Sequence, residues 1–172
     1  MKKLGVVWLL VCVAAGCAAE PTEPSAPDGQ GLTLTKVRFN PDGTSESTMQ
    51  YFPPTETGMK QLALAEEDIG CYDYNALWLY DSADLQGNRL CMVGSGSFWL
   101  GSYCRVWVPR HGCILSWDKS VRSLWAGARA GELRTRQPGG GDANPILYPF
   151  NPWQVDWTLS ATAQDAWEVM QY

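Results

Sequence analysis

The fold of this chain is decided by the stretch Tyr80-Asp81-Ser82-Ala83-Asp84-Leu85-Gln86-Gly87. An aromatic residue is followed five positions later by an apolar residue, and two positions after that by glycine. With this spacing, we expect the loop between two strands to fold back so that Leu85 covers Tyr80. The backbone angle that follows is one that only glycine adopts cheaply, which explains Gly87. The stretch therefore predicts a β-hairpin with a folded-back loop.

From residue 71 onward, short apolar segments alternate with Gly, Asn, Asp and Ser. Turn residues that recur about every 8–12 positions are typical of an all-β domain. The expected strands cover residues 76–80, 89–93, 105–108, 123–125 and 132–136, and further short apolar segments lie at 146–150 and 153–159. A glycine-rich break separates the two groups. The pattern predicts an all-β domain over residues 71–172.

A smaller unit is expected in front of this domain, over residues 32–70. Residues 32–39 and 47–52 have strand composition and flank turn chemistry at 40–43, which predicts a hairpin. Thr55 is placed to cap a short helix that runs to about residue 68. The acidic run that ends this helix is interpreted as a solvated face. The sequence leaves open whether the unit packs on the domain or acts as a separate adaptor.

The hairpin signature resembles that of the β/γ-crystallin family, with Leu85 in place of the usual second aromatic residue. Residues 116–124 are similar to the family's late segment, in which an Asx-rich loop precedes serine and an apolar strand. A fainter recurrence at 165–169 suggests a second motif. The resemblance implies a β/γ-crystallin-like Greek-key sandwich, with a first Greek key over 71–126 and a degenerate second one over 127–172.

The same resemblance implies a candidate calcium loop at residues 118–123. Its possible ligands are Asp118 and Ser123. Calcium takes about six to eight oxygen ligands, whereas Lys119 and Arg122 place two cations in this loop. We therefore expect a weak or lost metal site, and Asp118 and Ser123 can equally serve to hydrogen-bond the loop.

The first residues have the pattern that is typical of an export signal. Lys2 and Lys3 precede an apolar run that is too short to span a bilayer, and the run ends in Ala14-Ala15-Gly16-Cys17. This ending resembles the lipobox of bacterial lipoproteins, which implies a signal peptide over 1–16 and lipidation (palmitate) at Cys17. An ordinary secretory leader is the alternative. A Pro-rich, polar segment over 17–31 is expected to form a flexible tether.

The expected location is the cell envelope, with the protein anchored in the membrane by its lipid. Ala18 follows the lipidated cysteine where an aspartate would resemble an inner-membrane retention signal, so outer-membrane delivery is favoured. Loss of the leader changes the net charge of the chain from −5 to −7, because Lys2 and Lys3 leave with it. This charge argues against nucleic acid as a partner.

Four cysteines remain once Cys12 leaves with the leader and Cys17 is lipidated. They are Cys71, Cys91, Cys104 and Cys113. An even number in an oxidising compartment predicts two disulfides. Three pairings are possible, and we favour Cys104–Cys113, which closes a short loop, together with Cys71–Cys91.

A bridge between Cys104 and Cys113 would strap the loop between them. Such a loop is preorganised for binding, and Arg105, Trp107 and Arg110 are residue types found at binding hot spots. The chain is also similar to secreted metalloproteinase inhibitors, which share the crystallin-like fold and two disulfides. Peptidase inhibition is therefore the sharpest functional hypothesis. The alternative is a hairpin that only contributes Val106 and Val108 to the core.

Eight tryptophans follow Cys17, and this density suggests a glycan-binding or structural envelope protein as the second hypothesis. Most of them are expected to fill the core, and Trp99 and Trp153 are the ones most expected to be exposed. Catalysis has little support. His111 is the only histidine, no nucleophile-elbow context is present, and no carboxylate pair lies on an identifiable shared face. We expect a non-catalytic binding protein with no cofactor. Calcium is the one candidate, at the weak or lost site of residues 118–123.

Overall fold

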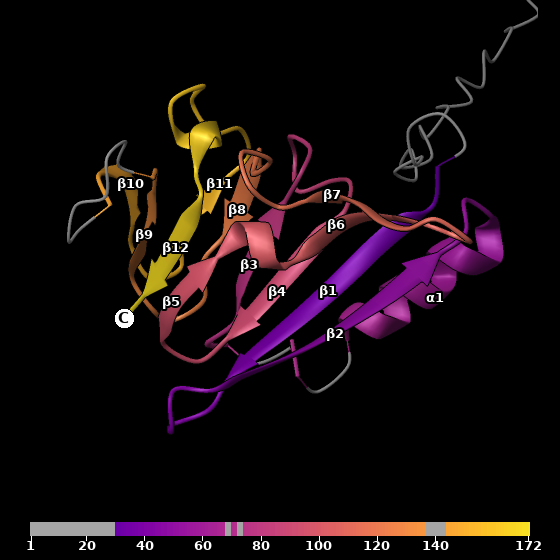
Figure 1. Ribbon diagram of the computed structural model, residues 1–172, viewed down its shortest axis with the longest axis horizontal. Helices are drawn as coiled ribbons and strands as arrows, with labels where there is room; N and C mark the ends of the chain where they lie inside the picture. The colour runs from indigo at the N-terminus through magenta and orange to yellow at the C-terminus, as the bar shows by residue number, and fades with distance from the viewer. Residues whose placement is uncertain (1–29, 68–69, 72–73, 137–143) are drawn as a thin grey trace, which may run out of the picture.

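The computed structural model describes residues 30–67, 70–71, 74–136 and 144–172 (Figure 1). The predictions for the leader, for Cys17 and for the break at 139–142 concern residues outside these ranges. Strands dominate the described chain, which confirms the all-β class. The strands are β1 (Leu32–Phe39), β2 (Ser45–Phe52), β3 (Leu77–Tyr80), β4 (Arg89–Val93), β5 (Gly96–Trp99), β6 (Cys104–Val108), β7 (Gly112–Ser116), β8 (Ser123–Trp125), β9 (Gly131–Arg134), β10 (Ile146–Phe150), β11 (Val155–Asp156) and β12 (Glu168–Gln171).

The helices are α1 (Glu56–Glu66) and two single turns of 3₁₀-helix, η2 (Leu100–Ser102) and η3 (Ala163–Asp165). Thr55 caps α1 as expected, because its side chain accepts a hydrogen bond from the Gly58 amide at 3.1 Å. Among the described residues, no helix is long and apolar enough to cross a membrane.

Two sheets form the body of the protein. One has six strands in the order β11-β8-β3-β4-β1-β2, and the other has four in the order β10-β9-β12-β5. Apolar side chains from both sheets meet in one fully buried core, which contains Leu77, Leu79, Leu90, Met92, Leu124, Phe98, Leu133 and Val169. The alternation of side chains along each strand explains this division, since every second residue points into the core.

The two sheets exchange strands. β5 follows β4 in the chain but pairs with β12 in the four-stranded sheet. β11 follows β10 but pairs with β8 in the six-stranded sheet. The half of the domain with β3, β4 and β8 therefore contributes β5 to the four-stranded sheet, and the half with β9, β10 and β12 contributes β11 to the six-stranded sheet.

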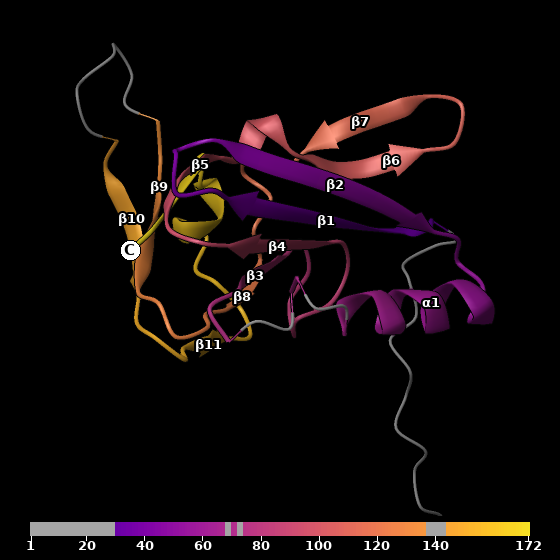
Figure 2. The same ribbon diagram turned by 90° about the horizontal axis from the view of Figure 1, so that it is seen from below.

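The N-terminal hairpin is part of the larger sheet. β1 pairs with β2 in the antiparallel sense and with β4 in the parallel sense, with Leu34 opposite Arg89. The helix α1 then packs on the outer face of this sheet, where Leu62 joins a second apolar cluster. Figure 2 shows α1 on one side of β1 and β2, and the β6–β7 ribbon on the other. The structure thus answers the question left open by the sequence, because the unit packs on the domain.

All the expected strands are present, and those at 32–39, 89–93, 123–125 and 146–150 have the bounds that were predicted. The strand expected within 153–159 is confined to Val155–Asp156, and α1 ends at Glu66 rather than near residue 68. Three strands were not predicted, namely β5, β7 and β12. β5 lies beside Gly94, whose φ is +103°, so its short sequence reads as a loop.

Both favoured disulfides are confirmed. Cys71 is bonded to Cys91 and Cys104 to Cys113. The first bond links the segment after α1 to β4, and the second joins β6 to β7.

Candidate ligand-binding groove

The predicted folded-back loop is observed between β3 and β4. Leu85 packs against the apolar cluster that contains Tyr80, and Gly87 has a φ of +85°. The Ser123 hydroxyl holds the loop in place, accepting a hydrogen bond from the Leu85 amide at 3.1 Å and donating one to the Ser82 carbonyl at 2.6 Å. The loop therefore closes over the outer face of the six-stranded sheet.

The residues of the candidate calcium loop do not fit a metal ion. Ser123 is fully buried and its hydroxyl is engaged by the folded-back loop. Asp118 accepts a hydrogen bond from the Ser116 hydroxyl. The Arg122 guanidinium donates to the carbonyl of Lys119 at 3.2 Å, so a cationic side chain already uses an oxygen of this loop. This donor set supplies too few free oxygens for calcium.

The loop between Cys104 and Cys113 forms a two-stranded arm, β6–β7. Arg105 is held within the protein, since its guanidinium donates to Asp81 Oδ2 at 2.8 Å. Trp107 lies against Tyr51 with ring centroids 5.5 Å apart, and Arg110 is exposed at the turn with a φ of +74°. Of the three predicted loop residues, Arg110 is therefore the one whose side chain points freely to solvent.

The arm contributes little to the core. Val106 and Val108 are half-buried, and Ile114 and Leu115 on β7 are exposed. The alternative in which these valines fill the core is not what the structure shows. The arm is instead a disulfide-closed ribbon with an apolar outer surface.

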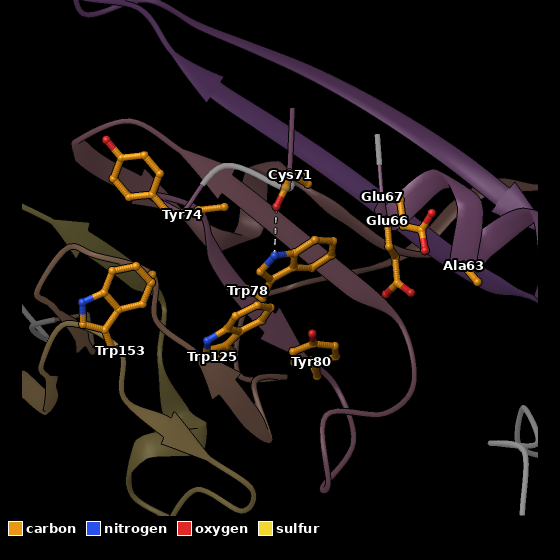
Figure 3. Close-up of a pocket in the computed structure, with 11 residues that line it drawn as sticks. Ala63, Glu66, Glu67, Cys71, Tyr74, Trp78, Tyr80, Trp125 and Trp153 are labelled. Carbon is orange, nitrogen blue, oxygen red and sulfur yellow. Dashed lines mark hydrogen bonds between the residues drawn. The ribbon is translucent and has the colours of Figure 1, made fainter. Parts of the chain in front are cut away.

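A cavity with an aromatic lining lies on the opposite side, beside α1 (Figure 3). We call it the aromatic groove. Its volume is about 510 Å³. The described residues that line it are Ala63, Glu66, Glu67, Cys71, Tyr74, Ala76, Trp78, Tyr80, Trp125, Gly127 and Trp153.

The floor of the aromatic groove is formed by β3 and β8. Trp78 and Tyr80 lie two residues apart on the same face of β3, and their rings stack with centroids 6.2 Å apart. Trp125 is directly opposite Trp78 on the neighbouring strand β8. The Trp78 indole donates to the Cys71 carbonyl at 3.3 Å, which fixes its orientation. The floor is therefore a row of aromatic rings held in place by the sheet.

The rim of the groove carries exposed aromatic side chains. Trp125 is 43% exposed, Trp153 58% and Tyr74 66%. Two backbone contacts hold this rim, because the Trp153 amide donates to the Gly127 carbonyl and a Cβ on Gly127 would lie 2.2 Å from the Tyr74 carbonyl oxygen. Only glycine permits this close approach. The backbone around Gly127 thus fixes the position of the rim, and the indole of Trp153 is exposed to solvent there.

The other end of the groove is acidic. Glu66 forms an ion pair with Arg89, and burial raises the pKa of the Glu66 carboxyl while Arg89 lowers it. Burial, and to a smaller extent Glu66, raises the pKa of Tyr80 to about 12 against the effect of Arg89. Tyr80 is therefore a neutral phenol at any physiological pH. The groove combines aromatic faces, a phenol and two carboxylates.

Sequence reasoning found part of this site. Trp99 and Trp153 were predicted to be exposed and are, but Trp99 lies on β5 in the other sheet. Trp125 and Trp157 are exposed without having been predicted to be so, and the alternation of Trp125 with the buried Leu124 places it on the opposite face. That alternation, shared with Trp78 on β3, is the signal that could have revealed the groove.

Comparison with protein-family models and with curated protein sequences finds no match for this chain.

Proposed function

We propose that this protein is a lipid-anchored, extracytoplasmic binding protein whose aromatic groove holds a glycan. The observation that carries the proposal is the pair of exposed indoles, Trp125 and Trp153, beside the stacked rings of Trp78 and Tyr80. Sugar rings have C–H faces that pack on aromatic rings, and their hydroxyl groups need nearby acceptors. Pockets that bind small ligands share this combination of apolar walls and a few placed polar groups. The proposed role is non-catalytic.

The fold proposed for this role is the β/γ-crystallin-like double Greek key. In a Greek key, the fourth strand returns to lie beside the first. Here β8 lies beside β3, which is followed by β4, while β12 lies beside β9, which is followed by β10. The third strand of each set, β5 or β11, lies in the facing sheet. This order supports two equivalent motifs, with β1, β2 and the β6–β7 arm as additions.

The anchor is proposed from the sequence ending at Cys17, which lies outside the described residues. Replacement of Cys17 by serine removes the thiol that would receive the lipid, so we expect the variant to leave the membrane fraction. Cys12→Ser is the matched control, because that cysteine lies within the proposed leader. A Cys17→Ser protein that still sediments with membranes would contradict lipid anchoring.

Glycan binding is tested with the soluble domain from residue 18 onward, by titration with peptidoglycan fragments and chitin oligosaccharides while tryptophan fluorescence is followed. We expect Trp125→Ala and Trp153→Ala each to weaken binding about tenfold, which corresponds to about 1.4 kcal/mol. Trp99→Ala is the matched control, since Trp99 is 49% exposed but lies outside the groove. Binding that is lost equally in all three variants, or no binding at all, would refute the proposal.

A second candidate function, peptidase inhibition, is favoured by the β6–β7 arm. The Cys104–Cys113 bond closes this ribbon, and Ile114, Leu115 and Arg110 expose apolar and cationic groups on it. The test is titration of the soluble domain against a panel of secreted proteases, with Arg110→Ala as the informative variant. No inhibition at micromolar protein would eliminate this function without affecting the glycan proposal.

A further inference from the structure

The charged side chains that line the aromatic groove, among the described residues, are all negative. Its charged lining residues in the described chain are Glu66 and Glu67, and neither lysine nor arginine lines it. Both glutamates come from the C-terminal end of α1, and the last turn of this helix contains no basic residue. The carbonyl end of a helix carries partial negative charge, which adds to that of the two carboxylates.

The two carboxylates differ in how far their charge is compensated. Glu66 is paired with Arg89, which is itself not among the lining residues. Glu67 is exposed, and none of the ion pairs formed among the described residues involves it. Figure 3 shows both side chains at the helix end of the groove, on the side away from Trp153. Among the described residues, the negative charge of Glu67 at this end of the aromatic platform is therefore not paired with a cation.

We infer that the aromatic groove selects glycans that carry a free amino group, such as chains of de-N-acetylated amino sugar. The inference rests on the proposed glycan function and names the substrate class. An ammonium group is attracted by indole and phenol faces, best when it is partly desolvated. It also donates charge-assisted hydrogen bonds to a carboxylate. In a chain of such sugars laid along the groove, one ring would stack on Trp125 while an ammonium group of the chain would meet the glutamates at the helix end.

The same geometry acts against other glycans. An N-acetylated sugar has no cation to pair with the glutamates, and an acidic sugar would place like charge beside them. We therefore expect binding in the order amino sugar, N-acetylated sugar, acidic sugar. Because the charge on Glu67 is exposed, salt should reduce the differences among the three.

The experiment compares glucosamine and N-acetylglucosamine oligosaccharides of equal length on the same soluble domain, at low and at high salt. We expect the amino form to bind about tenfold more tightly at low salt, equivalent to about 1.4 kcal/mol. Glu67→Gln should reduce this preference and Glu66→Gln/Glu67→Gln should abolish it. Glu46→Gln is the control, since Glu46 is an exposed acid on β2 outside the groove. Binding of the N-acetylated sugar reports that each variant is folded.

The outcomes separate the two proposals. Equal affinity for both sugars, lost in Trp125→Ala, would overturn the amino-sugar inference and leave the glycan function supported. A preference that survives in the double glutamine variant would also overturn the inference, because the charge would then come from elsewhere. Binding of neither sugar would overturn the inference together with the function on which it rests.

Discussion

The Ser123 hydroxyl accepts a hydrogen bond at 3.1 Å from the backbone amide of Leu85, a residue 38 positions earlier in the chain. It also donates to the Ser82 carbonyl at 2.6 Å. A single buried side chain on β8 thus satisfies two backbone groups of the β3–β4 loop. Backbone groups buried without a partner are costly, so this contact fixes the loop on the sheet.

Replacement of Ser123 by alanine should lower the free energy of unfolding by about 2 kcal/mol, because the Leu85 amide loses its buried partner. Chemical denaturation of the soluble domain measures this change. Ser102→Ala is the control, since Ser102 is exposed. Equal stability of the two variants would show that the loop does not depend on the serine.

Alanine substitutions at two glycines should distinguish the cost of a strained backbone from the cost of steric overlap. Gly43 and Gly87 have φ values of +84° and +85°, but a Cβ on Gly43 meets no atom within 4 Å, whereas one on Gly87 lies 2.1 Å from Asp81 Oδ1. Gly43→Ala should therefore cost only the left-handed conformation, about 1 kcal/mol. Gly87→Ala should cost clearly more, because Asp81 must move. Thermal or chemical unfolding of both variants checks the order, and a larger cost at Gly43 would contradict it.

Asp81 connects the β6–β7 arm to the body of the protein. Its carboxylate accepts from the Asn88 amide and side chain, both at 2.7 Å, and from Arg105 at 2.8 Å. Asp81→Ala should destabilise the domain by about 3 kcal/mol, since it leaves the Asn88 donors unpaired and removes the carboxylate partner of Arg105. Asp84→Asn, at an exposed position with a φ of 58°, is the matched control. Denaturation midpoints of the two variants measure this difference, and equal midpoints would show that Asp81 does not stabilise the domain.

The buried phenol of Tyr80 should lower the free energy of unfolding in alkali. Its pKa rises from 10.0 in the unfolded chain to about 12 in the folded protein, chiefly because of burial. A raised folded-state pKa contributes stability that is complete below pH 10 and is lost as the pH approaches about 12. The wild-type unfolding free energy should therefore fall over this range relative to that of Tyr80→Phe. Parallel pH profiles of the two proteins would disprove the shift.

The two disulfides should have separable effects. Their sequence separations are 20 for Cys71–Cys91 and 9 for Cys104–Cys113, so loop entropy predicts contributions of about 3 kcal/mol for each, with the first slightly larger. Serine variants of Cys104 and Cys113 should loosen the arm and leave the proposed glycan binding intact. Variants of Cys71 and Cys91 should weaken that binding as well, because Cys71 lines the groove and its carbonyl positions Trp78.

The local part of the fold could be predicted from the sequence. The spacing of Tyr80, Leu85 and Gly87 specifies the folded-back loop, because its causes are a side-chain contact and a backbone angle within eight residues. The segments 89–93 and 123–125 have strand composition of their own. The parallel pairing of β1 with β4 has no such local signal, since its backbone hydrogen bonds join residues 55 positions apart, such as Leu34 and Arg89.

The aromatic groove was missed for the same reason. Trp125 is exposed because α1 covers only part of the outer face of the sheet, and the position of α1 depends on where β1 docks. Glu66 and Glu67 were interpreted as a solvated face. Their place beside Trp78 and Tyr80 follows from packing of the helix end, which composition does not encode. Residue types were therefore recognisable, whereas their assembly into one site required the tertiary structure.

The position of β1 has a mechanical consequence. β1 begins at Leu32, directly after the segment that would lead to the anchor, and it is hydrogen-bonded along both edges, to β2 and to β4. A strand that is paired along both edges cannot leave the sheet until both sets of hydrogen bonds are broken. If the chain is anchored as proposed, tension on the segment ahead of Leu32 should therefore have to break both sets before β1 is released.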